Sequence, residues 1–443
     1  MLYNYLKNNM LKFPEQTISD GVTSITYKQL IDYAESFGQK LIKPKYGLLF
    51  KSELDTAKAL MACLYANKTA VVLSNKYGEL HNRKIIDTIK ISELITDSGI
   101  IHINSCTEQE DLSNVALIMC TSGTTGKPKG AMITHENLLT NVKDIRSYFS
   151  VCKSDHILIA RPLYHSAVLT GELLISLTNG LKIDFYSDGF TPSKIIEIIR
   201  KKECNVLCGT PTLFYHLSLI NIKSDYPVSL RVAAISGECM TKTAALKIRQ
   251  AFPGTQIYNV YGLTEASPRV SFLPPDKFDS KPLSVGMPLK SVKVKTVNNE
   301  LYVKGKSIMK GYYCNAEATN RVITDGWLHT GDIVSQDSEG MFYIKSRKDN
   351  MIIRAGMNIY PQEIENELKA HPKIKEVLVY GLKINSTTEK INIKVVTKEL
   401  TVTDIFEICK SRLPSYQMPD SIEIVNEIPK NASGKVIRNV FSK

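Results

Sequence analysis

Short apolar runs alternate with amphipathic stretches along the chain up to about residue 280. Thr26 can cap a helix, and Gln29 three residues later completes a capping box, so a helix is expected to begin there. Amphipathic spacing over 193–202 predicts another helix. Apolar runs too short for helices predict buried strands at 115–119, 205–208, 231–235 and 256–260. This alternation favours an α/β fold built of layered α/β subdomains.

The pattern changes beyond residue 280. Apolar and polar positions alternate over 292–297 and 300–303, which is typical of half-exposed antiparallel strands and predicts a β-rich subdomain. Past the charged stretch at 345–349, a compact α+β segment is expected. Its elements are a helix from Pro361 to Leu368 and strands near 376–380 and 391–396.

The length of the chain supports two domains, since 443 residues exceed what one hydrophobic core usually serves. We place a large N-terminal domain at 1–346 and a small α+β domain at 347–443.

Candidate chemistry follows the predicted strand at 115–119. Glycines let backbone N–H groups approach an anion, hydroxyls donate to phosphate oxygens, and lysine adds positive charge, so the next segment suits a polyphosphate. A Walker A loop is excluded, because Thr121 and Pro128 stand where that motif needs glycine and a hydroxyl residue. The candidate phosphate-binding residues are Thr121, Ser122, Gly123, Thr124, Thr125, Gly126 and Lys127.

Two further predicted strands end in polar, glycine-containing loops. The strand at 231–235 runs into Ser236, Gly237 and Glu238, and the strand at 256–260 runs into 261–265. Open α/β sheets form ligand crevices where their strands end, so we expect the three strand ends together to bind a ligand.

The composition of the chain argues against several classes of partner and ligand. The formal net charge is +12, but the basic residues are spread out and form no block, which argues against a nucleic-acid partner. Nine scattered cysteines without a Cys-x-x-Cys pair fit a reducing compartment and do not favour structural zinc. Without a signal-peptide pattern or an apolar stretch that could span a bilayer, a cytoplasmic protein is expected.

Taken in order, the motifs resemble the adenylate-forming superfamily of acyl- and aryl-CoA ligases, adenylation domains and firefly luciferase. The resemblance covers nearly the whole chain and depends on the segments 121–130, 261–265, 325–332, 346–349 with 360–365, and 429–435. It implies that a carboxylic acid reacts with ATP to give an acyl-adenylate and pyrophosphate, and that a thiol then attacks. It also implies a C-terminal domain that moves between the two half-reactions about a hinge at Asp349.

The resemblance implies a role for each matching residue. Lys435 would bridge the carboxylate and the α-phosphate, Thr264 would bind phosphate, and Glu265 would hold Mg²⁺. Asp332 and Arg347 would bind the ribose hydroxyls. The adenine slot would be formed by Ser236, Gly237, Glu238, Asn259, Tyr261 and Gly262, with Tyr261 against the base and Asn259 or the nearby backbone reading its amino edge.

His165, in the segment 161–166, resembles the histidine that flanks the acyl pocket of CoA ligases for simple acids. Amino-acid adenylation domains usually carry an acid shortly after an aromatic residue there, and none follows here before Glu172, so an α-amino acid is disfavoured. Arg269 could meet a second carboxylate or face solvent. Fatty, aryl and dicarboxylic acids all stay open.

Departures from the family pattern bear on the acceptor thiol. The chain is shorter than most relatives, so part of the N-terminal subdomain is expected to be reduced. Ala355 replaces the first glycine of a common pair near the thiol tunnel, which leaves a carrier-protein phosphopantetheine open beside CoA. The expected activity is an acyl- or aryl-CoA ligase, the alternatives being an acyl-carrier-protein ligase and a non-catalytic nucleotide-binding protein.

Overall fold

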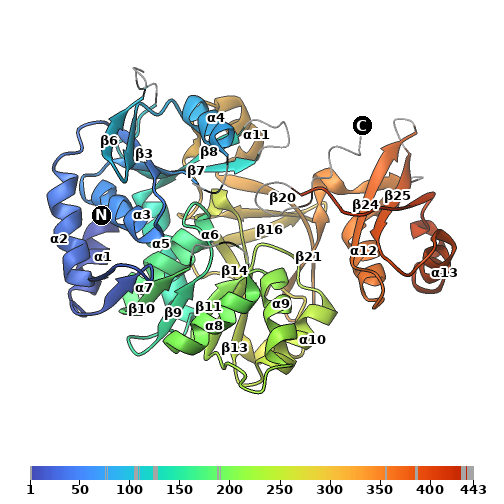
Figure 1. Ribbon diagram of the computed structural model, residues 1–443. Coiled ribbons are helices and arrows are strands. Elements are labelled where there is room, and N and C mark those ends of the chain that lie inside the picture. Colours follow the sequence, from blue (N-terminus) through green and yellow to red (C-terminus); the bar gives the residue numbers. More distant parts are fainter. Residues whose placement is uncertain are drawn as a thin grey trace. The chain divides into compact units, whose positions relative to one another are not determined.

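The structure is a computed structural model that describes residues 2–74, 76, 78–103, 108, 110–122, 128–186, 189, 191–354, 357–384, 388–430 and 436. The chain divides into two compact units (Figure 1). The first comprises Met1–Met240, Ala244–Lys295 and Tyr302–His329, and the second comprises Thr241–Thr243, Thr296–Leu301 and Thr330–Lys443.

The described residues of the first unit form a nine-stranded sheet with parallel strands at its centre. Its strands, in spatial order, are β15 (Met287–Pro288), β14 (Arg269–Leu273), β13 (Gln256–Gly262), β12 (Val232–Ser236), β11 (Val206–Gly209), β9 (His156–Ile159), β10 (Lys182–Phe185), β1 (Thr17–Ser19) and β2 (Ser24–Thr26). Because β12 and β13 are parallel neighbours, their polar carboxyl ends lie at the same edge.

A second sheet of the first unit has seven strands among the described residues. In spatial order they are β18 (Gly311–Tyr312), β8 (Pro128–Thr134), β7 (Val115–Ser122), β4 (Thr69–Val72), β3 (Lys45–Leu49), β5 (Glu93–Thr96) and β6 (Gly99–His102). The strand before Thr121, which the sequence pattern groups with β12 and β13 because all three end in polar loops, therefore lies in a different sheet from them. The reason is that the chain returns antiparallel as β8, so β7 pairs with β8 and β4 instead.

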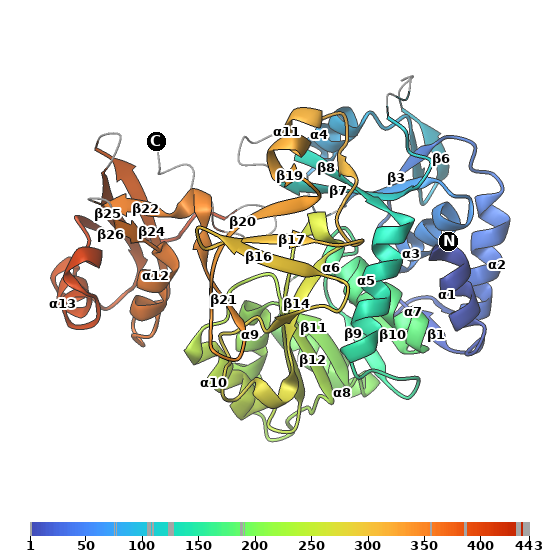
Figure 2. The same ribbon diagram turned by 180° about the vertical axis from the view of Figure 1, so that it is seen from behind.

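Helices of the first unit surround both sheets, and α1, α2 and α3 lie side by side (Figure 2). The capping box of Thr26 and Gln29 is confirmed at the start of α2. The helical elements are α1 (Leu2–Met10), α2 (Tyr27–Gly38), α3 (Glu53–Tyr65), α4 (Glu79–Ile89), α5 (His135–Tyr148), α6 (Ser166–Val168), a π-helical turn (Leu169–Leu174), α7 (Ile175–Asn179), α8 (Pro192–Lys202), α9 (Pro211–Asn221), α10 (Lys242–Ala251), α11 (Ala316–Val322) and 3₁₀ turns at Thr264–Ala266 and Pro275–Lys277.

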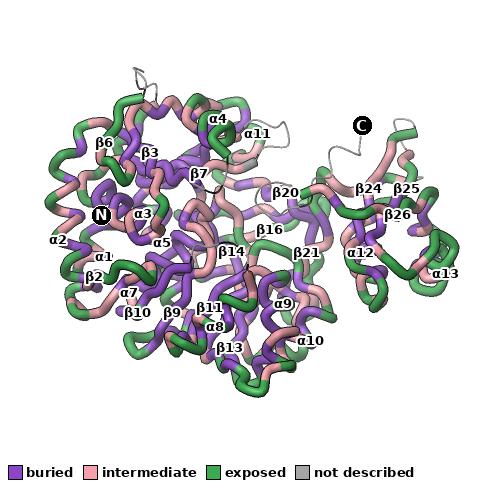
Figure 3. The backbone as a smooth tube through the Cα atoms, in the orientation of Figure 1, coloured by how far each residue is buried: buried purple, intermediate pink, exposed green. Residues whose placement is uncertain are grey.

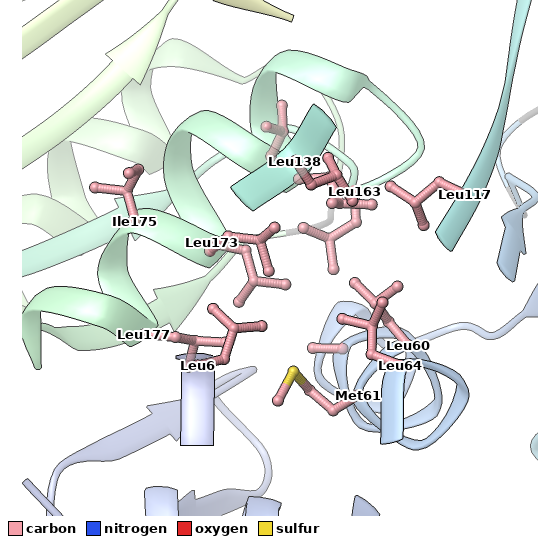
Figure 4. Close-up of a cluster of buried hydrophobic side chains, with 14 of the residues drawn as sticks. Leu6, Leu60, Met61, Leu64, Leu117, Leu138, Leu163, Leu173, Ile175 and Leu177 are labelled. Carbon is pink, nitrogen blue, oxygen red and sulfur yellow. The ribbon is translucent and has the colours of Figure 1, made fainter. Parts of the chain in front are cut away.

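The largest core of the first unit is made of apolar side chains that converge from several helices and strands (Figure 4). Leu6, Leu60 and Leu64 meet Leu173 and Leu177 in this core, and all five are buried. The burial is continuous along the central strands and falls off toward the outer helix faces (Figure 3). Among the described helices, none combines the length and apolarity needed to cross a bilayer.

The second unit has its own core, in which Ile364 and Leu368 pack with Val379, Ile393 and Ile405. Its elements are β22 (Ile352–Arg354), β23 (Met357–Ile359), α12 (Pro361–Lys369), β24 (Glu376–Lys383), β25 (Glu389–Val396), α13 (Val402–Arg412), a 3₁₀ turn (Ser415–Gln417) and β26 (Ser421–Ile424).

The β-rich part of the chain supplies β16 (Lys293–Val297), β17 (Glu300–Lys304), β19 (Ile323–Thr324), β20 (Trp327–Gln336), β21 (Phe342–Arg347) and a 3₁₀ turn at Lys348–Asn350. The predicted α/β class, with a β-rich part and a small α+β region, is confirmed. The domain boundary after residue 346 stays a prediction.

Candidate active site

The first part of the site lies where β13 ends. Thr264 and Glu265 form a 3₁₀ turn directly after that strand, and the Thr264 hydroxyl lies 3.2 Å from the hydroxyl of Ser166. Ser166 begins α6 and follows His165, whose ring lies 4.0 Å from that of Tyr164, measured between centroids. The structure therefore brings two segments about 100 residues apart, both predicted from the sequence, into contact.

Glu265 is held by a residue that the sequence analysis did not identify. The hydroxyl of Tyr312 donates to Glu265 Oε1 over 2.7 Å, and the backbone N–H of Met309 donates to the Glu265 carbonyl over 2.9 Å. Tyr312 belongs to β18, which pairs antiparallel with β8. On β8, the Nζ of Lys129 lies 5.3 Å from the centre of the Tyr312 ring.

The glycine-rich segment connects β7 to β8. Ser122 and Pro128 are paired in the antiparallel register, and the Thr121 hydroxyl donates to the carbonyl of Lys129 over 3.5 Å. A strand follows the segment, whereas a P-loop is followed by a helix, so the exclusion of a Walker A loop agrees with the fold. Gly123, Thr124, Thr125, Gly126 and Lys127 lie outside the described residues, as does the side chain of Ser122.

Thiol chemistry at this hairpin is disfavoured. Cys120 lies next to Thr121, and burial raises the pKa of its thiol to about 12. The thiolate is the nucleophilic form, and the raised pKa disfavours it near neutral pH.

The predicted adenine slot has an exposed side and a buried side. Ser236 ends β12, Gly237 follows at a φ of +92°, and the Glu238 carboxylate accepts from the N–H and the hydroxyl of Thr212 over 3.2 and 2.5 Å. Gly237 and Glu238 are exposed. This segment is accessible to a ligand, and its contact with adenine stays a prediction.

On the buried side, Asn259 is 3% exposed and its amide donates to the Ser284 carbonyl over 2.7 Å. The Asn259 Nδ2 is thus engaged inside the unit, and the reading of the base by Asn259 or the nearby backbone stays a prediction. Tyr261 is half-buried on β13, next to Gly262. A Cβ on Gly262 would lie 2.2 Å from the Pro268 carbonyl oxygen, so this bulged position requires glycine.

Beside the acid segment lies a buried ionic group. Glu172 is fully buried, and its carboxylate pairs with the Arg161 guanidinium at 2.7 Å. Burial raises the pKa of Glu172 although Arg161 opposes this. Arg269 is also buried, and donates to the Tyr148 hydroxyl over 2.7 Å and to the Gly171 carbonyl over 3.3 Å. The alternative that Arg269 faces solvent is therefore wrong.

In the second unit, Asp332 on β20 and Arg347 on β21 occupy paired register positions. Their side chains form an ion pair of 3.1 Å, and the same guanidinium nitrogen donates to the Thr330 carbonyl over 2.7 Å. The Asp332 side chain is 7% exposed, whereas that of Arg347 is 47% exposed. The predicted pair is thus assembled by the antiparallel pairing of two strands.

Glu300 supports this pair and was missed from the sequence. Its carboxylate accepts from the backbone N–H of Gly331, the residue before Asp332, over 3.1 Å. It also pairs with Lys348, the residue after Arg347, at 2.8 Å. Asp349, the predicted hinge, lies exposed in the 3₁₀ turn that follows Arg347. Lys435 lies outside the described residues, so its catalytic role stays a prediction.

The residues around Glu265 fit a magnesium ion bound together with a nucleotide. Tyr312 donates to one carboxylate oxygen, and Oε2 accepts no hydrogen bond from the part of the chain that the structure describes. A hard cation prefers oxygen ligands, and Mg²⁺ is usually held by one or two carboxylates plus substrate phosphates. A carboxylate oxygen that accepts no hydrogen bond from the described residues, on the residue that follows Thr264, meets that requirement.

Two protein-family models and several known proteins match the chain. The family model described as AMP-binding enzyme matches residues 102–313, and that described as AMP-binding enzyme C-terminal domain matches residues 363–435. A long-chain-fatty-acid–CoA ligase of Escherichia coli is 33% identical over 344 residues, which is 73% of this chain and 61% of the relative. A feruloyl-CoA synthase of Amycolatopsis is 32% identical over 74% of this chain and 69% of the relative.

The o-succinylbenzoate CoA synthetase of Bacillus subtilis, solved with its acyl-adenylate intermediate, superposes with a TM-score of 0.86 at 26% identity. That comparison covers 98% of this chain and 97% of the other, whereas the chain spans about three fifths of the length of the fatty-acid ligases that it matches. The same neighbour has been solved with ATP and magnesium. The chain belongs to the AMP-binding enzyme family, the adenylate-forming superfamily that its motifs resemble.

Proposed function

We propose that this protein activates a carboxylic acid with ATP and then transfers the acyl group to a thiol, most simply that of CoA. In the first half-reaction a carboxylate oxygen bonds to the α-phosphorus of ATP and pyrophosphate leaves. In the second, a thiol sulfur bonds to the acyl carbon and AMP leaves. The single observation that carries the proposal is the 3.2 Å contact between Ser166 and Thr264, with Glu265 adjoining.

That contact joins the segment proposed for the acid to the segment proposed for the phosphates. Both reactants are anions, so the site has to offset their repulsion while it holds them together. Thr264 would donate its hydroxyl to a phosphate oxygen, and Lys435 would bridge the two reactants. Magnesium, held by Glu265, would supply positive charge to the departing pyrophosphate. Asp332 would accept hydrogen bonds from the ribose hydroxyls, with Arg347 beside it.

The relatives support a carboxylic acid substrate without fixing which one. They are named for long-chain fatty acids, for ferulic acid and for o-succinylbenzoate, and each name includes CoA. CoA is therefore the acceptor that we propose for this chain, together with ATP and Mg²⁺. An acyl carrier protein is the alternative acceptor, which the experiment below separates from CoA.

The experiment is acid-dependent release of pyrophosphate from ATP and Mg²⁺ by the full chain, over fatty, aryl, dicarboxylic and amino acids, with and without CoA. Multiple turnovers that require both one acid and CoA would support the proposal. A stoichiometric burst of acyl-adenylate that CoA does not accelerate would favour a carrier protein as acceptor. No release with any acid would overturn the enzymatic proposal and favour the non-catalytic alternative.

A further inference from the structure

Tyr312 occupies a position between the proposed metal ligand and the glycine-rich hairpin. It lies on β18, is 6% exposed, and directs its hydroxyl at Glu265 Oε1 over 2.7 Å. Its ring face is approached by the ammonium group of Lys129, which adds a cation–π contact to the packing that fixes the ring. The hydroxyl is therefore held at a defined place rather than on a freely rotating side chain.

The chemistry of this hydrogen bond differs from that of an ion pair. A phenol donates a hydrogen bond to a carboxylate but keeps its proton, so Glu265 keeps its negative charge for a cation. The bond also restricts the rotation of the carboxylate and directs Oε2 away from Tyr312. A carboxylate fixed in this way loses less conformational freedom when it binds a metal, and such hydrogen-bonding supports commonly tune the affinity of metal ligands.

The backbone of the same segment makes the placement rigid. Met309 N–H donates to the Glu265 carbonyl over 2.9 Å, Lys310 N–H donates to the Met132 carbonyl over 2.9 Å, and Tyr313 N–H donates to the Gly130 carbonyl over 2.8 Å. Residues 309–313 therefore join the Thr264–Ala266 turn to β8, the strand that follows the glycine-rich segment. The two segments of the proposed phosphate site, the Thr264–Ala266 turn and the hairpin that includes β8, are thus both hydrogen-bonded to residues 309–313.

We propose that Tyr312 is a positioning residue that orients Glu265 for the magnesium ion of the bound nucleotide. This inference rests on the proposed function, because it takes Glu265 as the metal ligand. Tyr312 does not touch the reacting atoms; it acts through the Glu265 carboxylate. Nothing in the spacing of the sequence connects the two residues, which are 47 positions apart.

The test replaces Tyr312 with Phe, which removes the hydroxyl and keeps the ring. Mn²⁺ is the probe, and its affinity for the full-length protein saturated with ATP is measured by electron paramagnetic resonance. We expect Tyr312→Phe to weaken Mn²⁺ binding about tenfold, the lower range for losing a hydrogen bond to a charged group. Binding of ATP without a metal should not change.

The neighbouring tyrosine provides a matched control. Tyr313 is also buried, but its hydroxyl donates to Glu108 over 2.8 Å and accepts from Lys45, away from Glu265. Tyr313→Phe should leave the Mn²⁺ affinity unchanged. Equal losses in the two variants would show a general packing effect, and an unchanged affinity in Tyr312→Phe would also overturn the inference.

A double-mutant cycle tests whether Tyr312 acts through Glu265. If it does, adding Tyr312→Phe to Glu265→Gln causes no further loss of Mn²⁺ affinity; additive losses would overturn the inference. The proposed function is judged separately by acid-dependent pyrophosphate release of the unmodified protein. Release that is normal, together with an unaffected Tyr312→Phe variant, defeats only the role of Tyr312. Absence of release with every acid defeats the proposed function itself.

Discussion

Two carboxylates of this protein, Glu265 in the first unit and Asp332 in the second, are held in contrasting ways. Glu265 accepts one hydrogen bond from the neutral hydroxyl of Tyr312, and its other oxygen accepts none from the described residues. Asp332 pairs with the cationic Arg347, and its backbone N–H donates to the Thr330 hydroxyl over 3.0 Å. One carboxylate keeps its charge available, and the charge of the other is already balanced.

The difference fits the separate tasks proposed for them. A metal ion needs an oxygen that retains its negative charge, and a neutral donor orients that oxygen without competing for it. Neutral hydroxyl groups need a well-placed acceptor, and an acceptor that is paired with a guanidinium can be kept largely buried, as Asp332 is. The partner of each carboxylate therefore indicates what it can bind.

The largest effect is expected from Glu265→Gln, which removes the charge and keeps the shape. Loss of a metal ligand costs several kcal/mol of transition-state stabilisation, so acid-dependent pyrophosphate release should fall about 10²- to 10³-fold. Glu136→Gln is the control, since Glu136 forms an exposed pair with Lys306 in the same unit, and such pairs contribute little. A Glu265→Gln enzyme within threefold of the unmodified rate would remove the contrast between the two carboxylates.

Asp332→Asn should act on nucleotide binding rather than on stability. Hydrogen bonds to a charged group contribute about 1.5 to 3 kcal/mol, so the KM for ATP should rise about 10- to 100-fold. Arg347 is about half exposed and can be solvated when its partner loses charge, so the thermal unfolding midpoint should change little.

Steady-state kinetics over a range of ATP concentrations and a thermal melt distinguish the two effects of Asp332→Asn. Asp337→Asn, in the turn that joins β20 to β21, is a control for disturbance of the same strand pair. An unchanged KM for ATP together with a large drop in the unfolding midpoint would mean that the Asp332–Arg347 pair is structural.

Gly262→Ala tests how rigidly the backbone leading to Thr264 and Glu265 is fixed. The added Cβ would lie 2.2 Å from the Pro268 carbonyl oxygen, and a backbone atom cannot move aside as a side chain can. We expect a loss of about 1 to 3 kcal/mol in the free energy of unfolding, measured by urea denaturation. Gly254→Ala, where a Cβ meets nothing within 4 Å, is the control. Equal stability of both variants would contradict the expectation.

Local patterns were enough to predict much of the fold. The capping box at Thr26, the helix at α8 and the strands β12 and β13 follow from spacings of a few residues, and the structure confirms each. The Asp332–Arg347 contact could also be anticipated, because the resemblance paired these residues and they lie only 15 positions apart on two consecutive strands.

Contacts between distant segments could not be predicted in this way. Nothing near Glu265 in the sequence indicates that Tyr312 donates to it, since the contact depends on the pairing of β18 with β8. The burial of Glu172 and Arg269 was likewise hidden, because charged residues are usually exposed. Glu172 lies in the π-helical turn at Leu169–Leu174, and Arg269, on β14, donates to the Gly171 carbonyl of that turn. The placement of β7 in a separate sheet has the same origin.

The smallest effect is expected from Gly331→Ala, at the residue before Asp332. Gly331 has a φ of +69°, and an added Cβ would lie 3.0 Å from the end of the Arg347 side chain. The left-handed backbone costs about 1 to 2 kcal/mol with alanine, measured by urea denaturation. Because the half-exposed guanidinium can shift slightly, the KM for ATP should rise only a few-fold.

Gly340→Ala distinguishes the two effects of Gly331→Ala, which are strain in the left-handed backbone and displacement of the Arg347 side chain. Gly340 lies in the turn that joins β20 to β21 and has a φ of +81°. An added Cβ there would meet only the side chain of Gln336, at 3.6 Å. Both variants should therefore lose similar stability, and only Gly331→Ala should raise the KM for ATP. If both variants raised it equally, backbone strain would explain the effect, and the position of Arg347 against Asp332 would not matter for the nucleotide.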